Sequence, residues 1–140
     1  MRAPIAQTLE NIDIGMVGIP YDGALTNRPG ARHGPREVRN QSSLMRAINH
    51  VTRINPYELC RIADVGDVPF HSVFDIEKTH KNISDFIAVM VAAGVMPLSC
   101  GGDHSVSLPI MRAIATQPMA FIHIDAHTDT WDSFQGSKFN

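Results

Sequence analysis

Four short apolar segments alternate along the chain with segments whose apolar residues recur at helical spacing. The expected strands cover residues 11–20, 59–65, 95–99 and 119–125. The expected helices cover residues 36–49, 74–93 and 107–115. Such an alternation is typical of a parallel sheet with helices on its faces. We therefore predict an α/β fold with three αβα layers and a mainly parallel sheet.

Length and composition limit the class of protein. The 140 residues suffice for a hydrophobic core, and we expect residues 1–140 to form a single domain. A net charge of −2 gives no basic field for nucleic acid or anionic membrane. No apolar run reaches the roughly 18 residues of a membrane span. No signal peptide is visible, and the separated Cys60 and Cys100 fit a reducing compartment, so we expect a cytoplasmic protein.

Residues 121–129 read FIHIDAHTD. In an extended backbone, side chains two positions apart point the same way, so His123, Asp125, His127 and Asp129 would share one side. Desolvating carboxylates is unfavourable unless a cation neutralises them. A divalent metal ion, or a pair of ions, explains this run. The alternative is a solvated polar edge, which seldom alternates with isoleucine and alanine.

A second polar cluster, CGGDHS at residues 100–105, follows the third expected strand. Ligands of open α/β sheets bind beyond the carboxyl ends of the strands. The two glycines permit a tight turn with unusual dihedrals and a close backbone approach, which places Asp103 and His104 at the rim. Alone, GGDH is as readily a structural turn. Beside an Asp-x-His-x-Asp run, it supplies His104 as a fourth ligand.

The ligand types indicate the ion and the reaction. Imidazole and carboxylate without thiolate suit Mn²⁺, Fe²⁺ or Zn²⁺. Asp125, central in its run, can bridge two ions, and a pair of metal ions predicts metal-assisted hydrolysis. The last expected strand has no crossover helix after it, which would leave the sheet with a raw edge. We therefore expect this chain to be the amino-terminal part of a longer protein.

Together, CGGDHS and IHIDAHTD resemble two signature motifs of the ureohydrolase family: arginases, agmatinases and relatives that hydrolyse guanidinium compounds to urea and an amine. The segment GIPYDGALTNRPGARHGPREVR at residues 18–39 is similar to the agmatinase-like branch. The resemblance covers residues 11–140 and implies an arginase-like fold, incomplete at its carboxyl end. It implies an agmatinase, which makes putrescine and urea from agmatine. The alternatives are a guanidinobutyrase or guanidinopropionase, whose substrate carboxylate would meet the arginines of residues 28–39, and a non-catalytic metal-binding homologue.

The resemblance also implies a site with two Mn²⁺ ions held by His104, Asp125, His127 and Asp129. In that family Asp125 would bridge both ions, and Asp129 would be the catalytic residue that passes a proton to the departing amine. His123 and Asp103 are expected to orient the ligands without binding the ions. The family's later SxDxDxxDP motif and its proton-shuttle histidine have no counterpart here. We therefore expect weak or no activity from residues 1–140 alone.

Three further residues are candidates for substrate binding. Asn27 and Arg28 lie in a long loop expected over residues 21–35, which leans over the pocket mouth in this family; turn chemistry is the alternative. Trp131 either lines the pocket or caps the core. The expected partner is a small guanidinium substrate, with no nucleic acid and no membrane. The family resemblance also implies a homo-oligomer.

Overall fold

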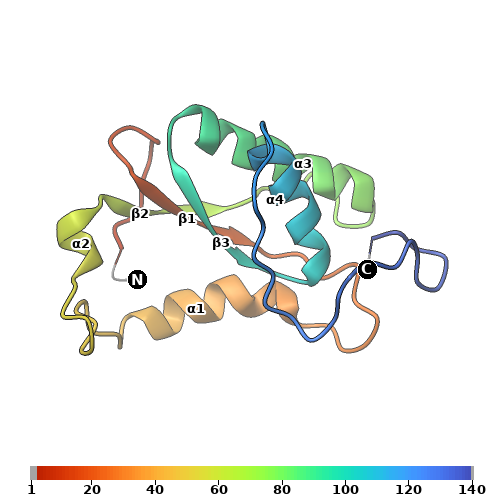
Figure 1. The fold of residues 1–140 in the computed structure, drawn as a ribbon, viewed down its shortest axis with the longest axis horizontal. Coiled ribbons are helices and arrows are strands. Elements are labelled where there is room, and N and C mark those ends of the chain that lie inside the picture. Colours follow the sequence, from red (N-terminus) through yellow and green to blue (C-terminus); the bar gives the residue numbers. More distant parts are fainter. Residues whose placement is uncertain (1–2, 140) are drawn as a thin grey trace.

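The computed structural model describes residues 3–139 and contains a three-stranded sheet with helices on both faces (Figure 1). The strands are β1 (Ile14–Ile19), β2 (Ile62–Asp67) and β3 (Met96–Gly101). The helices are α1 (Gly34–Ser42), α2 (Pro56–Leu59), α3 (Ile76–Ala92) and α4 (Ser107–Ile114). Two 3₁₀ turns, Ala31–His33 and His104–Val106, precede α1 and α4. The three predicted strands before residue 100 are therefore present.

The strand order β2-β1-β3 explains the layers. All pairings are parallel, and β1 lies in the centre. The connections from β1 to β2 and from β2 to β3 cross the sheet in opposite directions, so right-handed crossovers place α1 and α3 on opposite faces. Figure 1 shows α1 on one side of the sheet and α3 with α4 on the other. The predicted αβα architecture is confirmed.

The core lies between β1 and α3. Its fully buried apolar residues include Val17, Ile19, Ile83, Ile87 and Met90. Asp75 begins α3 by accepting a hydrogen bond from the N–H of Lys78, and Gly94 follows its end with a φ of +75°. The helix predicted over residues 74–93 is confirmed. Among residues 3–139 no helix, α3 included, is both long enough and apolar enough to cross a membrane.

The helix expected over residues 36–49 ends at Ser42 instead. Its predicted apolar face would consist of Val38, Leu44, Met45 and Ile48, and all four are exposed in the structure. A short amphipathic helix depends on packing of its apolar face, because its own hydrogen bonds barely offset the cost of ordering the backbone. The prediction is wrong beyond Ser42, where the apolar side chains are largely exposed.

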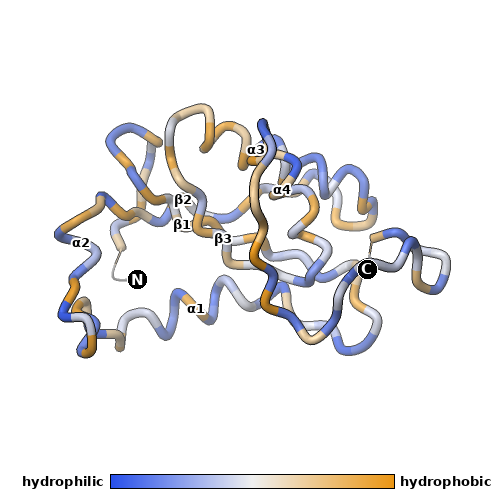
Figure 2. The backbone as a smooth tube through the Cα atoms, viewed as in Figure 1, coloured by the Kyte–Doolittle hydropathy of each residue, from blue (hydrophilic) through white to orange (hydrophobic). Residues whose placement is uncertain are grey.

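The strand expected over residues 119–125 does not form either. This stretch follows α4 and pairs with no strand in the part of the chain that the structure describes. In Figure 2 most of this stretch is coloured as apolar, and Phe121, Ile122 and Ile124 are exposed. Apolar and polar residues alternate from Ile122 onward, but a strand also needs a neighbour for its backbone N–H and C=O groups. The prediction of a fourth strand is wrong for this structure.

Candidate metal centre

Two loops meet at the carboxyl edge of the sheet. The first loop (residues 20–30) follows β1, and the His104 turn (residues 102–106) follows β3. The N–H of Gly102 donates to the carbonyl of Ile19 at 3.2 Å, and that of Asp103 to Tyr21 at 2.8 Å. A Cβ on Gly102 would lie 2.1 Å from the Tyr21 oxygen. Neither Gly101 nor Gly102 has a positive φ, so the expectation of unusual dihedrals at these glycines is wrong. Glycine is needed at position 102 because the Tyr21 carbonyl lies too close for a side chain.

Asp103 holds this junction together. Its buried carboxylate accepts hydrogen bonds from the N–H of Ser105 at 3.0 Å and from the Ser105 hydroxyl at 2.6 Å, both on Oδ1. Its Oδ2 accepts the N–H of Ala24, in the first loop, at 2.8 Å. The hydrogen bonds of Asp103 therefore link the two ends of the His104 turn and tie that turn to the first loop.

The first loop has an anchor of its own in Asp22. The buried Asp22 carboxylate accepts the N–H groups of Gly30 at 2.7 Å and Arg32 at 3.2 Å, and it forms an ion pair with the Arg32 guanidinium. The hydrogen bonds from Arg32, together with the backbone donors, lower the pKa of Asp22 to about 2. The long loop predicted from glycine and proline content is thus tied at both ends.

Four side chains converge beside the His104 turn. Nδ1 of His104 lies 3.3 Å from Oδ2 of Asp125 and 3.3 Å from Oδ2 of Asp129. Nε2 of His123 lies 3.5 Å from each of the same two oxygens. One ligand atom from each of these four residues lies within 4.8 Å of the others. We call His104, His123, Asp125 and Asp129 the convergent group.

His127 lies at the margin of this group. Its Nδ1 is 3.7 Å from Oδ1 of Asp125, and its side chain is 84% exposed. Its backbone N–H donates to Oδ1 of Asp125 at 2.9 Å, which bends the chain and ends the period of two. Asp129 has a φ of +52°, a left-handed conformation that aspartate tolerates, and its carboxylate lies beside His104. The assignment of His127 as a ligand stays a prediction.

The charge of the convergent group fits a divalent cation. The His127 N–H, and after it the imidazoles of His104 and His123, lower the pKa of the Asp125 carboxyl. Among residues 3–139 no lysine or arginine forms an ion pair with Asp125 or Asp129. Two carboxylates and two imidazoles without a cationic side chain match the ligand preferences of Mn²⁺, Fe²⁺ and Zn²⁺.

The predicted substrate-binding residues lie outside the convergent group. Asn27 and Arg28 are exposed in the first loop. Trp131 is 76% exposed and stacks at a tilt on Phe134, with 6.0 Å between ring centroids. Phe134 and the first loop line a cleft of about 700 Å³ at this end of the molecule, although Asn27 and Arg28 are not among its lining residues. Their role in substrate binding stays a prediction.

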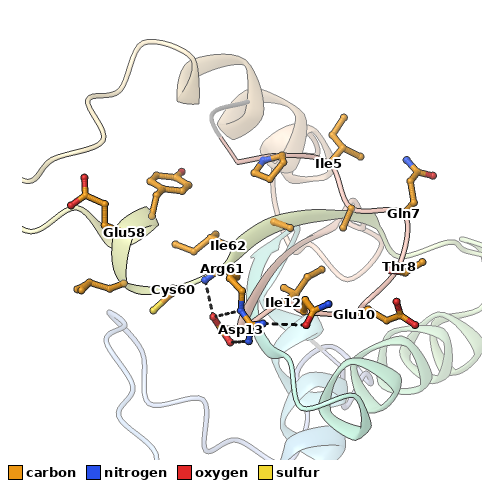
Figure 3. A pocket seen from close by; sticks show the side chains of 16 residues that line it. Ile5, Gln7, Thr8, Glu10, Ile12, Asp13, Glu58, Cys60, Arg61 and Ile62 are labelled. Atoms are coloured by element: carbon orange, nitrogen blue, oxygen red, sulfur yellow. Dashed lines mark hydrogen bonds and ion pairs between the residues drawn. The ribbon is translucent and has the colours of Figure 1, made fainter.

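A cleft of about 760 Å³ opens at the opposite, amino edge of the sheet. It lies between residues 4–13 and residues 57–63, just before β1 and β2 (Figure 3). Figure 3 shows Asp13 and Arg61 facing each other there, joined by an ion pair with 2.5 Å between Oδ1 and Nη2. These charges neutralise each other, and the convergent group lies at the other edge. This cleft is therefore not the candidate metal centre.

Comparison with known proteins identifies the family. The sequence model described as the arginase family matches residues 12–140. This chain belongs to the arginase family. The ureohydrolase resemblance of CGGDHS and IHIDAHTD is thereby confirmed, and the convergent group of this arginase-family chain is built from those two motifs.

The arginase-family relatives cover almost all of this chain. A guanidinopropionase of Pseudomonas aeruginosa is 49% identical over 139 residues, which are 99% of this chain and 43% of that protein. A mitochondrial agmatinase of Gallus gallus is 39% identical over 140 residues, 99% of this chain and 41% of that protein. The solved proclavaminate amidino hydrolase of Streptomyces clavuligerus matches with a TM-score of 0.91 at 32% identity, covering 99% of this chain and 46% of that one. The chain spans less than half the length of these relatives.

Proposed function

We propose that residues 1–140 are the amino-terminal part of a ureohydrolase domain that releases urea from a small guanidino compound. The observation that carries this proposal is the convergent group, in which two imidazoles and two carboxylates meet at the carboxyl edge of a parallel sheet. Relatives named for guanidinopropionate and agmatine support the substrate class.

The ions we propose are two Mn²⁺, held by His104, Asp125, His127 and Asp129. Asp125 is central in this set, because His104 approaches its Oδ2 and His127 its Oδ1. Bound divalent ions supply a nucleophile from water at neutral pH. His123, with its Nε2 3.5 Å from Oδ2 of both Asp125 and Asp129, would orient these carboxylates. Asp103 would do the same for His104 through the backbone of the turn.

The side chains suit a guanidinium substrate. A guanidinium group is cationic, and its resonance makes the central carbon a poor electrophile. Asp125 and Asp129 would hold the ions, and the nucleophile that the ions supply from water would attack this carbon when the substrate is bound beside it. Asp129, at the end of the convergent group, would transfer a proton to the departing amine, because C–N cleavage requires a neutral leaving group.

Agmatine is the first substrate we propose, and a guanidino acid is the second. The guanidino acid is favoured by Arg28, an exposed arginine of the first loop that forms no hydrogen bond or ion pair with any of residues 3–139. Arg32 and Arg39 are already engaged by Asp22 and Asp64 and therefore cannot serve a substrate carboxylate. The 49% identity with a guanidinopropionase supports the same alternative.

Urea release tests the proposal. The protein with its natural flanking sequence is loaded with Mn²⁺ and offered agmatine, arginine, 4-guanidinobutyrate and 3-guanidinopropionate in separate reactions. Urea from one of these compounds, lost in Asp125→Asn, supports the ureohydrolase. Stoichiometric metal binding without urea from any compound would instead indicate a non-catalytic metal-binding homologue. Residues 1–140 alone should give little or no urea.

We also propose a homo-oligomer that resides in the cytoplasm. The agmatinase-like resemblance supports the oligomer, and the separated cysteines fit a reducing compartment. Light scattering on the purified protein measures its mass, and cell fractionation measures its location. A monomer, or a protein recovered with membranes, would contradict these two statements.

A further inference from the structure

A buried hydrogen-bond chain connects α3 to the His104 turn. His80, on α3, is only 4% exposed, and its Nε2 lies 3.3 Å from the hydroxyl oxygen of Ser105. The Ser105 hydroxyl in turn lies 2.6 Å from Oδ1 of Asp103. The chain thus runs from a helix of the core to the residues on either side of His104. His80 and Ser105 are 25 residues apart, so no local pattern of residues indicates this contact.

The direction of each hydrogen bond follows from its partners. A carboxylate only accepts, so the Ser105 hydroxyl donates to Asp103, and the short distance of 2.6 Å fits a bond to an anionic oxygen. The Ser105 oxygen then remains as the acceptor for His80. Nε2 of His80 must therefore carry the ring proton, and this N–H donates a hydrogen bond to the Ser105 oxygen. Burial lowers the pKa of His80, which favours the neutral ring that this assignment requires.

Nδ1 of His80 is buried and has no hydrogen-bond partner among the described residues. In the neutral ring with a proton on Nε2, this atom is an unpaired acceptor. Leaving an acceptor unpaired in the core is unfavourable, so packing alone would favour an apolar residue at position 80. The bond to Ser105 is therefore the feature of this histidine that an apolar side chain would lack.

We propose that His80 is a positioning residue of the metal centre, which acts on His104 through Ser105 and Asp103. This inference rests on the proposed function, because it takes His104 to be a metal ligand. His80 holds the Ser105 hydroxyl toward Asp103, and Asp103 in turn holds the N–H of Ser105 and of Ala24. The backbone on both sides of His104 is thereby fixed, which orients its imidazole toward Asp125 and Asp129.

Calorimetric titration of the metal-free protein with Mn²⁺ tests the proposal, on the protein with its natural flanking sequence. His80→Leu keeps an apolar side chain of similar size but removes the donor. We expect it to weaken Mn²⁺ affinity 10- to 100-fold, the usual effect of removing a group that orients a ligand. His80→Gln returns an N–H donor and should recover most of that loss. His50→Leu, the same substitution at an exposed histidine, is the matched control and should bind as the wild type does.

Ser105→Ala provides the second variant, in case His80→Leu fails to fold. It removes the middle of the chain and should weaken Mn²⁺ binding as His80→Leu does, and the two losses should not add in the double variant. Unchanged affinity in folded His80→Leu or Ser105→Ala, or equal loss in His80→Gln, would overturn the positioning role while leaving the proposed function intact. A wild-type protein that binds no divalent ion would overturn both.

Discussion

The carboxylate of Asp103 accepts the backbone N–H of Ala24 at 2.8 Å, across 79 positions of the sequence. Together with the hydrogen bond from the Asp103 N–H to the Tyr21 carbonyl, this contact joins the first loop to the turn that presents His104. The loop predicted to meet the substrate and the turn predicted to hold the metal are therefore parts of one hydrogen-bonded unit. All variants below are made in the protein with its natural flanking sequence.

Asp103→Ala should destabilise the fold. It leaves the N–H groups of Ala24 and Ser105 without their acceptor, and each lost buried hydrogen bond costs about 1–2 kcal/mol, so we expect a total of about 2–4 kcal/mol. Urea unfolding of the metal-free protein measures the change. Asp132→Ala, at a side chain that is 87% exposed, is the control and should change stability by less than about 0.5 kcal/mol. Equal stability of the two variants would contradict the anchoring role of Asp103.

Gly102→Ala should be poorly tolerated, whereas Gly101→Ala should be mild. The new Cβ at position 102 would lie 2.1 Å from the Tyr21 carbonyl oxygen and overlap it. The Tyr21 backbone can move away only if the first loop separates from the His104 turn. At position 101 it would meet only Cγ2 of Val106 at 3.1 Å, the end of a side chain. We expect a loss of about 1–3 kcal/mol for the first variant. The urea midpoints measure the difference, and a reversed order would show that the loops do not approach as closely as described.

The lowered pKa of Asp22 predicts that the folded state loses stability as the pH falls. The pKa of Asp22 is about 2 in the folded state against 3.8 ordinarily, so the folded state binds the proton less readily than the unfolded state. The resulting stability, on the order of 1–2 kcal/mol after allowance for the half-exposed Arg32, is present above about pH 4. It is lost as the pH falls toward 2. Asp22→Asn lacks this contribution, so the difference in unfolding free energy between it and wild type should shrink between pH 5 and pH 2.5. A constant difference would argue against the ion pair.

His127 and His123 can be told apart by metal stoichiometry. The family resemblance makes His127 a ligand, whereas the structure brings His123 into the convergent group and leaves His127 largely exposed. We expect His127→Ala to lose one of two bound Mn²⁺ ions per chain. His123→Ala should keep both ions with roughly 10-fold weaker affinity. Calorimetry gives both values, and the opposite pattern would assign the ligand role to His123.

Arg28→Ala distinguishes the two substrate candidates. In the wild type, the Arg28 guanidinium is free to pair with a substrate carboxylate, and agmatine has no carboxylate. If the enzyme accepts 3-guanidinopropionate, the variant should raise KM for that compound about 10-fold, the loss of one charge-assisted hydrogen bond. Its kcat/KM for agmatine should stay the same. Arg36→Ala, which removes a neighbouring arginine paired with Glu37, serves as the control.

Local signals in the sequence located α3 and the two polar motifs. The helix was predictable because its apolar positions recur at helical spacing and because Gly94 follows its end. The convergence of His104 with Asp125 and Asp129 was predictable from residue type, because clustered carboxylates need a cation, and imidazoles are the ligands that complete a site for it. The chemistry of the residues, rather than the strand itself, supported that expectation, since residues 119–125 pair with no described strand.

The features that sequence did not reveal depend on neighbours distant in the chain. The apolar residues at positions 44 and 48 have helical spacing, yet no described element covers them, and α1 stops before them. The need for glycine at position 102 comes from the Tyr21 carbonyl, and the role of His80 comes from Ser105. Neither relation leaves a pattern in local composition or periodicity.

The first loop is tied to the His104 turn almost wholly through main-chain groups: the carbonyl of Tyr21 and the N–H of Ala24. Among the described residues, the side chains of residues 25–28 form no hydrogen bond to the His104 turn. Residues 25–28 can therefore be exchanged without untying the loop. This separation makes the segment a natural place to engineer substrate preference by small libraries, since diversity there leaves the scaffold of the metal centre intact.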